Sequence, residues 1–206
     1  MQLIYIHDPM CSWCWAFAPA WKEIQAKLPQ GVETLVLLGG LAPDSDEPMP
    51  DQMQQYLRET WQRIEASVPG TRFDHSFWQV CQPRRSTWPA CRAVLAAEAL
   101  REGAAAAMTS AIQQAYYLQA KNPSDDAVLV ALAGEIGLDE AAFSAELNSE
   151  ANRQRHQGQM AQAQALQVNS YPTLLLRSGS QLVRLPLDYN DPQSTLNAID
   201  SAIHSV

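Results

Sequence analysis

The sequence predicts an α/β fold in which a βαβ unit at the N-terminus and a ββα unit at the C-terminus flank a long helical segment. Two observations lead to this prediction. Short apolar runs suited to buried strands lie near the two ends of the chain, whereas from about residue 51 to residue 168 the apolar residues follow a helical period. The chain has 206 residues, 47% of them hydrophobic, which suits one domain with a large insertion.

The N-terminal unit begins with residues 3–6, a short apolar run that breaks at residues 8–9 (Asp-Pro), as expected for a buried strand entering a loop. A helical pattern follows over residues 12–28, and Pro19 is expected to kink this helix because it removes one backbone donor. Residues 32–38 form a second compact apolar run. In a βαβ unit the two strands usually run parallel, with a right-handed crossover between them.

The central segment is expected to be helical throughout. Residues 41–50 are rich in Pro and Asp and predict a loop before it. Asp139 is expected to cap one helix, with Leu138 and Phe143 as a hydrophobic staple around the cap. The predicted helices cover residues 51–67, 74–81, 87–101, 103–120, 125–136, 140–148 and 150–166.

The pattern changes back to strands after residues 171–172 (Tyr-Pro). Residues 173–176 and 181–185 are strand-like runs joined by a Gly-containing loop, which predicts an antiparallel hairpin, and a helix over residues 192–203 follows. The two terminal units can pair into one sheet only if the central helices are an insertion.

This layout is that of a thioredoxin fold split by a helical domain. We therefore expect a discontinuous thioredoxin-like domain over residues 1–45 and 168–206, and a helical insertion domain over residues 46–167.

Two cysteines, Cys11 and Cys14, stand two residues apart at the predicted strand-to-helix junction. Cys11 would lie at the helix N-terminus, where free backbone N–H groups and the helix dipole stabilise a thiolate that can attack a disulfide. Cys14 would lie one turn further in, close enough to resolve the mixed disulfide. The pattern predicts a redox-active pair, with Cys11 as the nucleophile and Cys14 as the resolving cysteine.

Other interpretations of the cysteines stay open. A CxxC pair can be half of a zinc site, but a second CxxC and a His-x₃₋₅-His are missing and the spacing of Cys81 and Cys91 does not match a zinc knuckle, so we expect no metal. The pair could also be two buried helix cysteines. Cys81 and Cys91 are expected to be buried free cysteines, with a second disulfide or an electron relay to Cys14 as the alternatives.

The run DPMCSWCWAF (8–17), with SYPT at 170–173 and the helical insertion between them, resembles the cytoplasmic branch of the DsbA-like thioredoxin superfamily. More narrowly, it is similar to the predicted protein-disulfide isomerases related to FrnE. The resemblance implies an oxidoreductase acting on cysteines, with Cys11 and Cys14 catalytic and Pro172 as a cis-proline.

Three further residues are candidates around this motif. A cis bond at Pro172 would leave the backbone of Tyr171 free to pair with an extended peptide. Trp13, between the two cysteines, is expected to be exposed and to contact an apolar substrate. His7 is a candidate for proton transfer, with Asp8 as the alternative, and either could equally be a loop residue.

The sequence departs from the periplasmic pattern of the superfamily. Ser12-Trp13 stands where that pattern has Pro-His, and the strand at residues 3–6 lacks a buried acid, so an isomerase or reductase is expected rather than a strong oxidant. The related kappa-class glutathione transferases and chromene-carboxylate isomerases have a serine where Cys11 stands. A glutathione-dependent transferase or isomerase is one alternative function, and a non-catalytic peptide-binding or chaperone module is another.

The net charge and the lengths of the apolar runs limit the kinds of partner that the sequence predicts. The formal net charge of −8 argues against nucleic acid, and Arg84-Arg85 is expected to be a solvated loop. The sequence has no apolar run of about 18 residues, so no membrane partner is expected, and Met1-Gln2 leads directly into a strand, which favours the cytoplasm. The expected partners are protein or peptide thiols and disulfides, with glutathione or a thioredoxin-type reductant and no cofactor.

Overall fold

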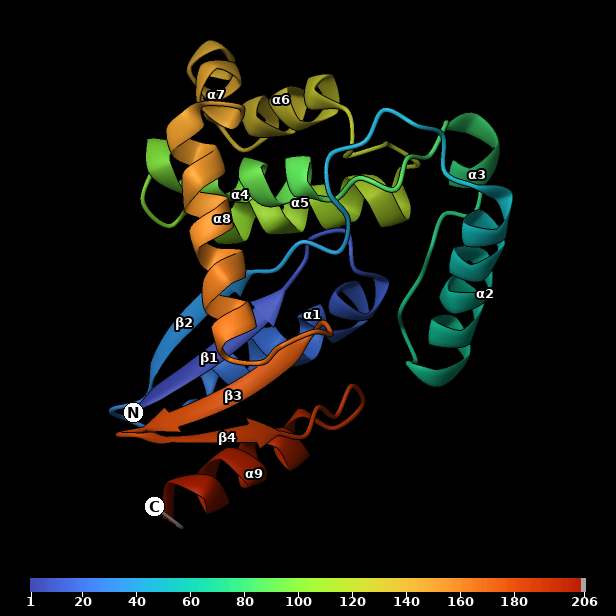
Figure 1. The fold of residues 1–206 in the computed structure, drawn as a ribbon. Helices are drawn as coiled ribbons and strands as arrows, with labels where there is room; N and C mark the ends of the chain where they lie inside the picture. The colour runs from blue at the N-terminus through green and yellow to red at the C-terminus, as the bar shows by residue number, and fades with distance from the viewer. Residues whose placement is uncertain (205–206) are drawn as a thin grey trace.

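The structure, a computed structural model that describes residues 1–204, is built around one four-stranded sheet with the strand order β2-β1-β3-β4 (Figure 1). Strand β1 pairs in parallel with β2 and antiparallel with β3, and β3 and β4 form an antiparallel hairpin. The predicted α/β class, the parallel pair and the hairpin are therefore confirmed. The strands are β1 (Gln2–His7), β2 (Glu33–Leu38), β3 (Thr173–Ser178) and β4 (Gln181–Leu185).

Seven helices, α2 to α8, fill the described chain between β2 and β3, whereas α1 lies between β1 and β2 and α9 follows β4. Helix α1 continues through Pro19, and Asp139 caps α7 by accepting a hydrogen bond from the Ala142 N–H at 2.7 Å, as predicted. The helices are α1 (Ser12–Ala26), α2 (Asp51–Ser67), α3 (Phe77–Val80), α4 (Trp88–Leu100), α5 (Ala104–Leu118), α6 (Asp126–Glu135), α7 (Glu140–Leu147), α8 (Glu150–Ala165) and α9 (Pro192–His204).

The predicted helix over residues 74–81 is too long, because only Phe77–Val80 are helical. Asp74 is held outside the helix: its N–H donates to the Tyr117 carbonyl at 2.6 Å, and its carboxylate accepts from the N–H and hydroxyl of Ser76. A distant backbone partner and a local turn therefore shorten the helix at its N-terminal end.

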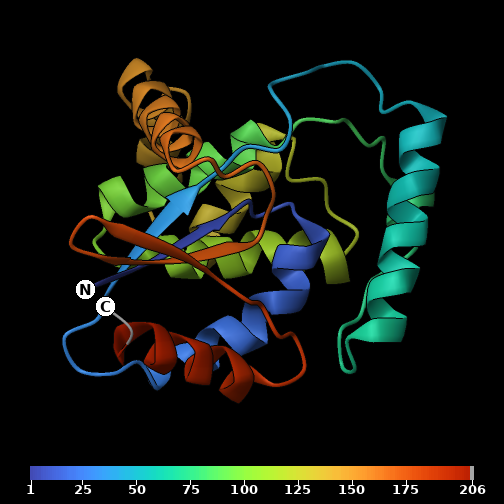
Figure 2. The same ribbon diagram turned by 60° about the horizontal axis from the view of Figure 1, so that its bottom comes forward.

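Successive side chains of β1 point to opposite faces of the sheet, and each face is covered by helices. Leu3 and Tyr5 pack with residues of α1 and α9 on one face, whereas Ile4 and Ile6 pack with α8 on the other. Figure 2 shows α1 and α9 together beneath the sheet and α8 above it. Because all four side chains are buried, β1 is the central element of the fold.

The helices between β2 and β3 have a core of their own, centred on the fully buried Trp61 of α2. The Trp61 ring stacks on Phe73 with centroids 4.8 Å apart and meets Tyr116 and Tyr117 edge-on. This core also takes in Met10, from the loop after β1, so it reaches the end of the sheet where the cysteine pair lies. Figure 1 shows α4 and α5 crossing over that end.

The division into two domains at residues 45 and 168 stays a prediction, and residues 205–206 of the predicted second segment lie outside the described residues. Within residues 1–204, no helix has both the length and the apolarity that crossing a membrane requires.

Gly158 offers a test of helix α8. It is exposed, and an added Cβ would meet nothing within 4 Å. Gly158→Ala should raise the free energy of unfolding by about 0.5–1 kcal/mol in urea denaturation, because alanine loses less backbone entropy in a helix. Gly179→Ala is the matched control: it also has open space but a φ of +55°, so it should lower stability. A loss of stability in Gly158→Ala would contradict a helix at this position.

Candidate active site

Cys11 lies where the loop after β1 enters α1. It is the N-cap residue of α1, with extended backbone (φ −83°, ψ 117°), and its carbonyl accepts the Trp15 N–H at 3.0 Å. Its own N–H donates to the Asp8 carbonyl at 3.0 Å. Cys11 is 6% exposed, and its thiol donates to the Tyr171 carbonyl at 3.4 Å. The nucleophile candidate therefore stands at the start of a helix, opposite a backbone carbonyl from the far end of the chain.

Cys14 is enclosed behind Cys11, with 0% of its surface exposed. Burial raises the pKa of the Cys14 thiol well above its usual value, and the neighbouring Cys11 thiol and the Asp8 carboxylate raise it further. A protonated Cys14 is a poor nucleophile at rest. Cys14 is thus the more deeply buried of the two cysteines, and its burial disfavours the thiolate form.

The Tyr171–Pro172 peptide bond is cis, as the resemblance implies. It precedes β3 and brings the Tyr171 carbonyl to the Cys11 thiol. The Tyr171 ring lies against Gly39, where an added Cβ would stand 2.1 Å from a ring carbon, so only glycine fits beneath this ring. The three predicted residues Cys11, Tyr171 and Pro172 are therefore brought together.

The predicted exposure of Trp13 is wrong. Trp13 is half-buried and its ring meets Tyr189 edge-on, with centroids 5.3 Å apart. Tyr189 also meets Phe17 at 5.3 Å, and burial together with the nearby Cys14 and Cys11 thiols raises its pKa. Sequence reasoning missed Tyr189 because it lies in the loop between β4 and α9, where no apolar period marks it.

Ser12, the other residue between the cysteines, is tied to the helical core. The Trp61 indole N–H donates to its hydroxyl oxygen at 2.9 Å, and both side chains are buried. This bond crosses 49 positions of sequence and connects the first turn of α1 to α2. The side chain at position 12 is therefore held by Trp61 and brings no charge to the neighbouring cysteines.

His7 and Asp8 are both buried. The His7 ring stacks on Tyr5 with centroids 4.9 Å apart, and its Nδ1 has no hydrogen-bond partner. Burial lowers the pKa of His7 to about 4, so the ring is neutral near pH 7. Asp8 is 0% exposed and accepts hydrogen bonds from the Met10 and Leu41 N–H groups, both at 2.8 Å. Sequence reasoning named Asp8 only as an alternative, although it stands three residues before the cysteine pair.

The other two cysteines have separate surroundings. Cys91 is buried, as expected, whereas Cys81 is half-buried and donates to the Ala120 carbonyl at 2.9 Å. Within residues 1–204, no three His, Cys, Asp or Glu side chains gather as a metal site would require.

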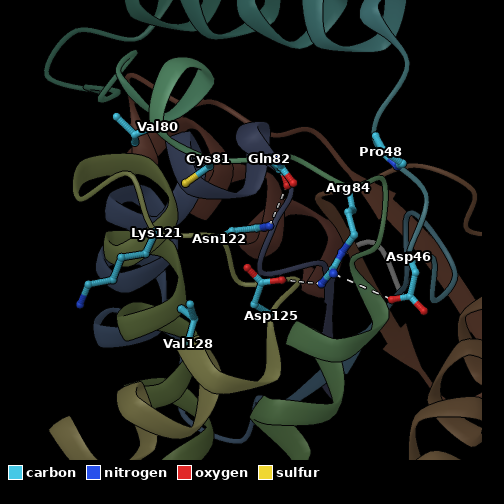
Figure 3. Close-up of a pocket in the computed structure, with 10 residues that line it drawn as sticks. All are labelled: Asp46, Pro48, Val80, Cys81, Gln82, Arg84, Lys121, Asn122, Asp125 and Val128. Atoms are coloured by element: carbon cyan, nitrogen blue, oxygen red, sulfur yellow. Dashed lines mark hydrogen bonds and ion pairs between the residues drawn. The ribbon is translucent and has the colours of Figure 1, made fainter.

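A cavity of about 440 Å³ lies among the helices, away from the cysteine pair (Figure 3). Arg84 points into it and is paired with Asp125 at 2.6 Å and Asp46 at 3.8 Å, so the expectation of a solvated Arg84 is wrong. Neither Cys11 nor Cys14 lines this cavity. The lining residues are Asp46, Pro48, Val80, Cys81, Gln82, Arg84, Lys121, Asn122, Asp125 and Val128.

The family model for the DSBA-like thioredoxin domain matches residues 2–188. Among curated proteins, the chain is 25% identical over 175 residues to the ClpXP adapter protein SpxH of Bacillus subtilis, which covers 84% of this chain and 57% of that protein. The chain thus spans little more than half the length of this relative.

Two solved structures share the fold over nearly their whole length. A protein of Nitrosomonas europaea, suggested to be a protein disulfide isomerase, superposes with a TM-score of 0.85 at 24% identity, covering 99% of this chain and 98% of that one. The cytosolic disulfide reductase DsbM of Pseudomonas aeruginosa gives 0.79 at 24% identity with both chains fully covered, and its structure with GSH gives 0.77.

Acid should destabilise the protein through His7. The unfolded ring binds a proton below its usual pKa of 6.5, whereas the folded ring stays neutral down to about 4. This contribution to stability is therefore complete above 6.5 and is lost as the pH falls toward 4, by about 2 kcal/mol between about pH 7 and pH 5. His7→Phe keeps a ring beside Tyr5 and should remove this loss, measured as the difference between urea-unfolding free energies at the two pH values.

The exposed His204 provides the control, since His204→Gln should leave the pH dependence as in the unaltered protein. The raised pKa of the buried Asp8 acts in the opposite direction but is common to the proteins compared. Equal losses of stability in His7→Phe and the unaltered protein would contradict a neutral, buried His7.

Proposed function

The chain belongs to the family of DSBA-like thioredoxin domains, and on that premise we propose that it is a thiol–disulfide oxidoreductase whose redox pair is Cys11 and Cys14. One observation carries the proposal: Cys11 stands at the N-cap of α1 and keeps 6% of its surface exposed, while Cys14, within the first turn, is 0% exposed. An N-cap thiol meets the free N–H groups of the first helical turn, which stabilise a thiolate.

The proposed reaction is a two-electron exchange between this dithiol and a substrate disulfide. The Cys11 thiolate attacks one substrate sulfur, which forms a mixed disulfide and releases the first substrate thiolate. Cys14 then loses its proton and attacks the Cys11 sulfur, which releases the second substrate thiolate and leaves a Cys11–Cys14 disulfide. In an isomerase cycle, the released thiolate attacks a second disulfide of the substrate. The thiolate freed there attacks the substrate sulfur of the mixed disulfide, which restores the Cys11 thiolate and leaves the substrate disulfides rearranged.

Substrate would lie along the Tyr171–Pro172 segment. The Tyr171 carbonyl accepts a hydrogen bond from the Cys11 thiol in this structure. Once that thiol has reacted, the carbonyl can accept a hydrogen bond from a backbone N–H of an extended peptide. Trp13, half-buried against Tyr189, would offer apolar contact beside it. Proton transfer by His7 stays a prediction, and its pKa of about 4 makes it a weak base at neutral pH.

We further propose a protein-disulfide reductase or isomerase rather than a strong oxidant, acting in the cytoplasm. Neither Ser12 nor Trp13 carries a positive charge that would stabilise the Cys11 thiolate. The Ser12 hydroxyl instead accepts a hydrogen bond from the Trp61 indole. The similar structure of a cytosolic disulfide reductase, solved also with GSH, supports glutathione as the electron donor. A glutathione-dependent transferase is less favoured, because Cys11 stands where those enzymes have serine.

The two cysteines should respond differently to substitution. Cys11→Ser should abolish glutathione-driven reduction of a disulfide-bonded protein, since the nucleophile is lost. Cys14→Ser should instead accumulate a mixed disulfide at Cys11, because only the resolving step is removed. Insulin turbidity and intact-mass spectrometry measure the two effects, and refolding of a scrambled disulfide protein separates isomerase from reductase.

Cys81→Ala is the matched control, because this thiol is half-buried and lies far along the chain in another part of the fold. It should keep the unaltered rate. Full activity in Cys11→Ser, or a trapped species carried by Cys81, would rule out the proposed chemistry.

A protein-binding adapter is the second candidate, favoured by the 25% identity to SpxH over 84% of the chain. Under this function, the surface alone would bind a client and present it to a protease. The double variant Cys11→Ser/Cys14→Ser should then still stimulate client degradation by ClpXP in vitro. Loss of binding in the double variant, with its unfolding temperature unchanged, would favour thiol exchange instead.

A further inference from the structure

Asp8 is a fully buried carboxylate that the proposed thiol exchange leaves without a role. Its Oδ1 accepts the Met10 N–H at 2.8 Å. Its Oδ2 accepts the Leu41 N–H at 2.8 Å and the Thr87 hydroxyl at 2.7 Å, and the Cys91 thiol points at it from 3.7 Å. A buried carboxylate is tolerated when donors surround it, and these donors satisfy the one at Asp8.

The direction of the Thr87 hydroxyl follows from its neighbours. Its oxygen accepts the Ala42 N–H at 3.1 Å, so its single proton is left for another acceptor. The Ala42 carbonyl is 3.5 Å away and already accepts the Thr87 N–H at 3.0 Å, whereas Asp8 Oδ2 is at 2.7 Å. Thr87 therefore donates to Asp8, which acts as an acceptor.

Thr87 gives up a common helix-stabilising contact to do this. It is the N-cap residue of α4, yet its side chain makes no capping hydrogen bond. An N-cap threonine usually accepts a backbone N–H of the first turn, and losing that bond costs about 1 kcal/mol. Cys91, one turn into α4, donates a hydrogen bond from its thiol to the same carboxylate oxygen. Two side chains from the N-terminal end of α4 are therefore directed at Asp8.

Asp8 in turn contacts the redox pair directly. Its carbonyl accepts the Cys11 N–H at 3.0 Å. Asp8 also acts on Cys14 in two opposite ways: its backbone hydrogen bond lowers the pKa of the Cys14 thiol, and the charge of its carboxylate raises it. The same residue thus shapes the loop that places Cys11 and sets the charge beside Cys14. Thr87 and Cys91, which lie 79 and 83 positions after Asp8 in the sequence, are connected to the redox pair through it.

We propose that Thr87 and Cys91 are positioning residues for the redox pair: by donating to the Asp8 carboxylate, they keep it charged and thereby set the equilibrium between the Cys11–Cys14 disulfide and dithiol. The proposal rests on the proposed function. It also assigns Cys91 a role that needs neither a second disulfide nor an electron relay.

The electrostatic neighbours of Asp8 come from every element around it. Burial raises the pKa of Asp8, while the Leu41, Thr87 and Met10 hydrogen bonds and the Arg85 guanidinium lower it. Removing the Thr87 hydroxyl should therefore let Asp8 hold its proton to higher pH. The titratable and charged groups that interact with its charge are Cys14 of α1, Arg85 before α4, Cys91 of α4, Tyr116 of α5 and Tyr171 before β3.

The test is the equilibrium of the full-length protein with reduced and oxidised glutathione from about pH 5 to pH 9. Acid quenching, alkylation and mass spectrometry of the peptide that holds Cys11 and Cys14 give the dithiol fraction. A carboxylate beside Cys14 opposes thiolate formation, so losing its charge favours the dithiol. Thr87→Val should move the acid bend of the profile, where Asp8 takes up its proton, to higher pH. Across that bend the equilibrium constant should shift toward the dithiol by up to about fivefold, and the alkaline part of the profile should stay unchanged.

Matched variants separate this role from simple loss of packing. Thr87→Ser restores the hydroxyl and should return the profile to that of the unaltered protein. Asp8→Asn should give the dithiol-favouring shift at neutral pH without the acid bend, and Thr87→Val added to it should change nothing further. Cys91→Ala should give a smaller shift in the same direction, because a thiol is a weak donor.

Thr195→Val is the control for removing a buried threonine hydroxyl. Thr195 is 1% exposed and also makes two hydrogen bonds, to the Asp188 N–H and the Pro186 carbonyl, away from Asp8. Its equilibrium and pH profile should stay as in the unaltered protein.

An unchanged profile in Thr87→Val, with a lowered unfolding temperature, would show a purely structural threonine and overturn the inference while leaving the proposed function intact. Failure of the unaltered protein to form any Cys11–Cys14 disulfide would overturn the proposed function, and the inference with it.

Discussion

Burial of strand β1 on both faces is the constraint from which the rest of the structure follows. Leu3 and Tyr5 need the layer of α1 and α9, and Ile4 and Ile6 need the layer of α8, so the chain must supply helices to both sides of a sheet only four strands wide. Because the strand runs out at His7, the chain leaves the sheet at its centre. The loop after β1 and the start of α1 therefore lie at the end of the sheet that α4 and α5 cross (Figure 1).

The proposed redox pair, Cys11 and Cys14, lies where two hydrophobic cores meet. Phe17 belongs to the core beneath the sheet, whereas Trp13 and Trp15, four and two residues earlier, pack against the core of the helical segment. Tyr189 packs against both. Helix α1 thus divides its faces between the two cores, and its first turn is held from both sides. Such a turn has little freedom to move, which suits a site whose two sulfur atoms must stay within reach of each other.

Low polarity around the pair explains the electrostatics of the region. His7 is held neutral and Cys14 protonated by the same cause, the loss of water on burial. Burial raises the pKa of Asp8 as well, but hydrogen bonds from Leu41, Thr87 and Met10 oppose this effect. A buried charge in an apolar setting acts over a longer range than a solvated one. Groups that donate to Asp8 can therefore influence sulfur atoms that they do not touch.

The sequence by itself determined what depends on neighbours along the chain: the strand runs, the cysteine pair at a strand–helix junction, and the Asp139 cap, each set by residues a few positions apart. The tertiary structure alone decided what depends on distant partners. Tyr117 shortens α3, Tyr189 covers Trp13, and Thr87 is turned from its own helix toward Asp8. No local pattern marks these contacts, because each joins segments dozens of residues apart whose proximity arises only when both faces of the sheet are covered.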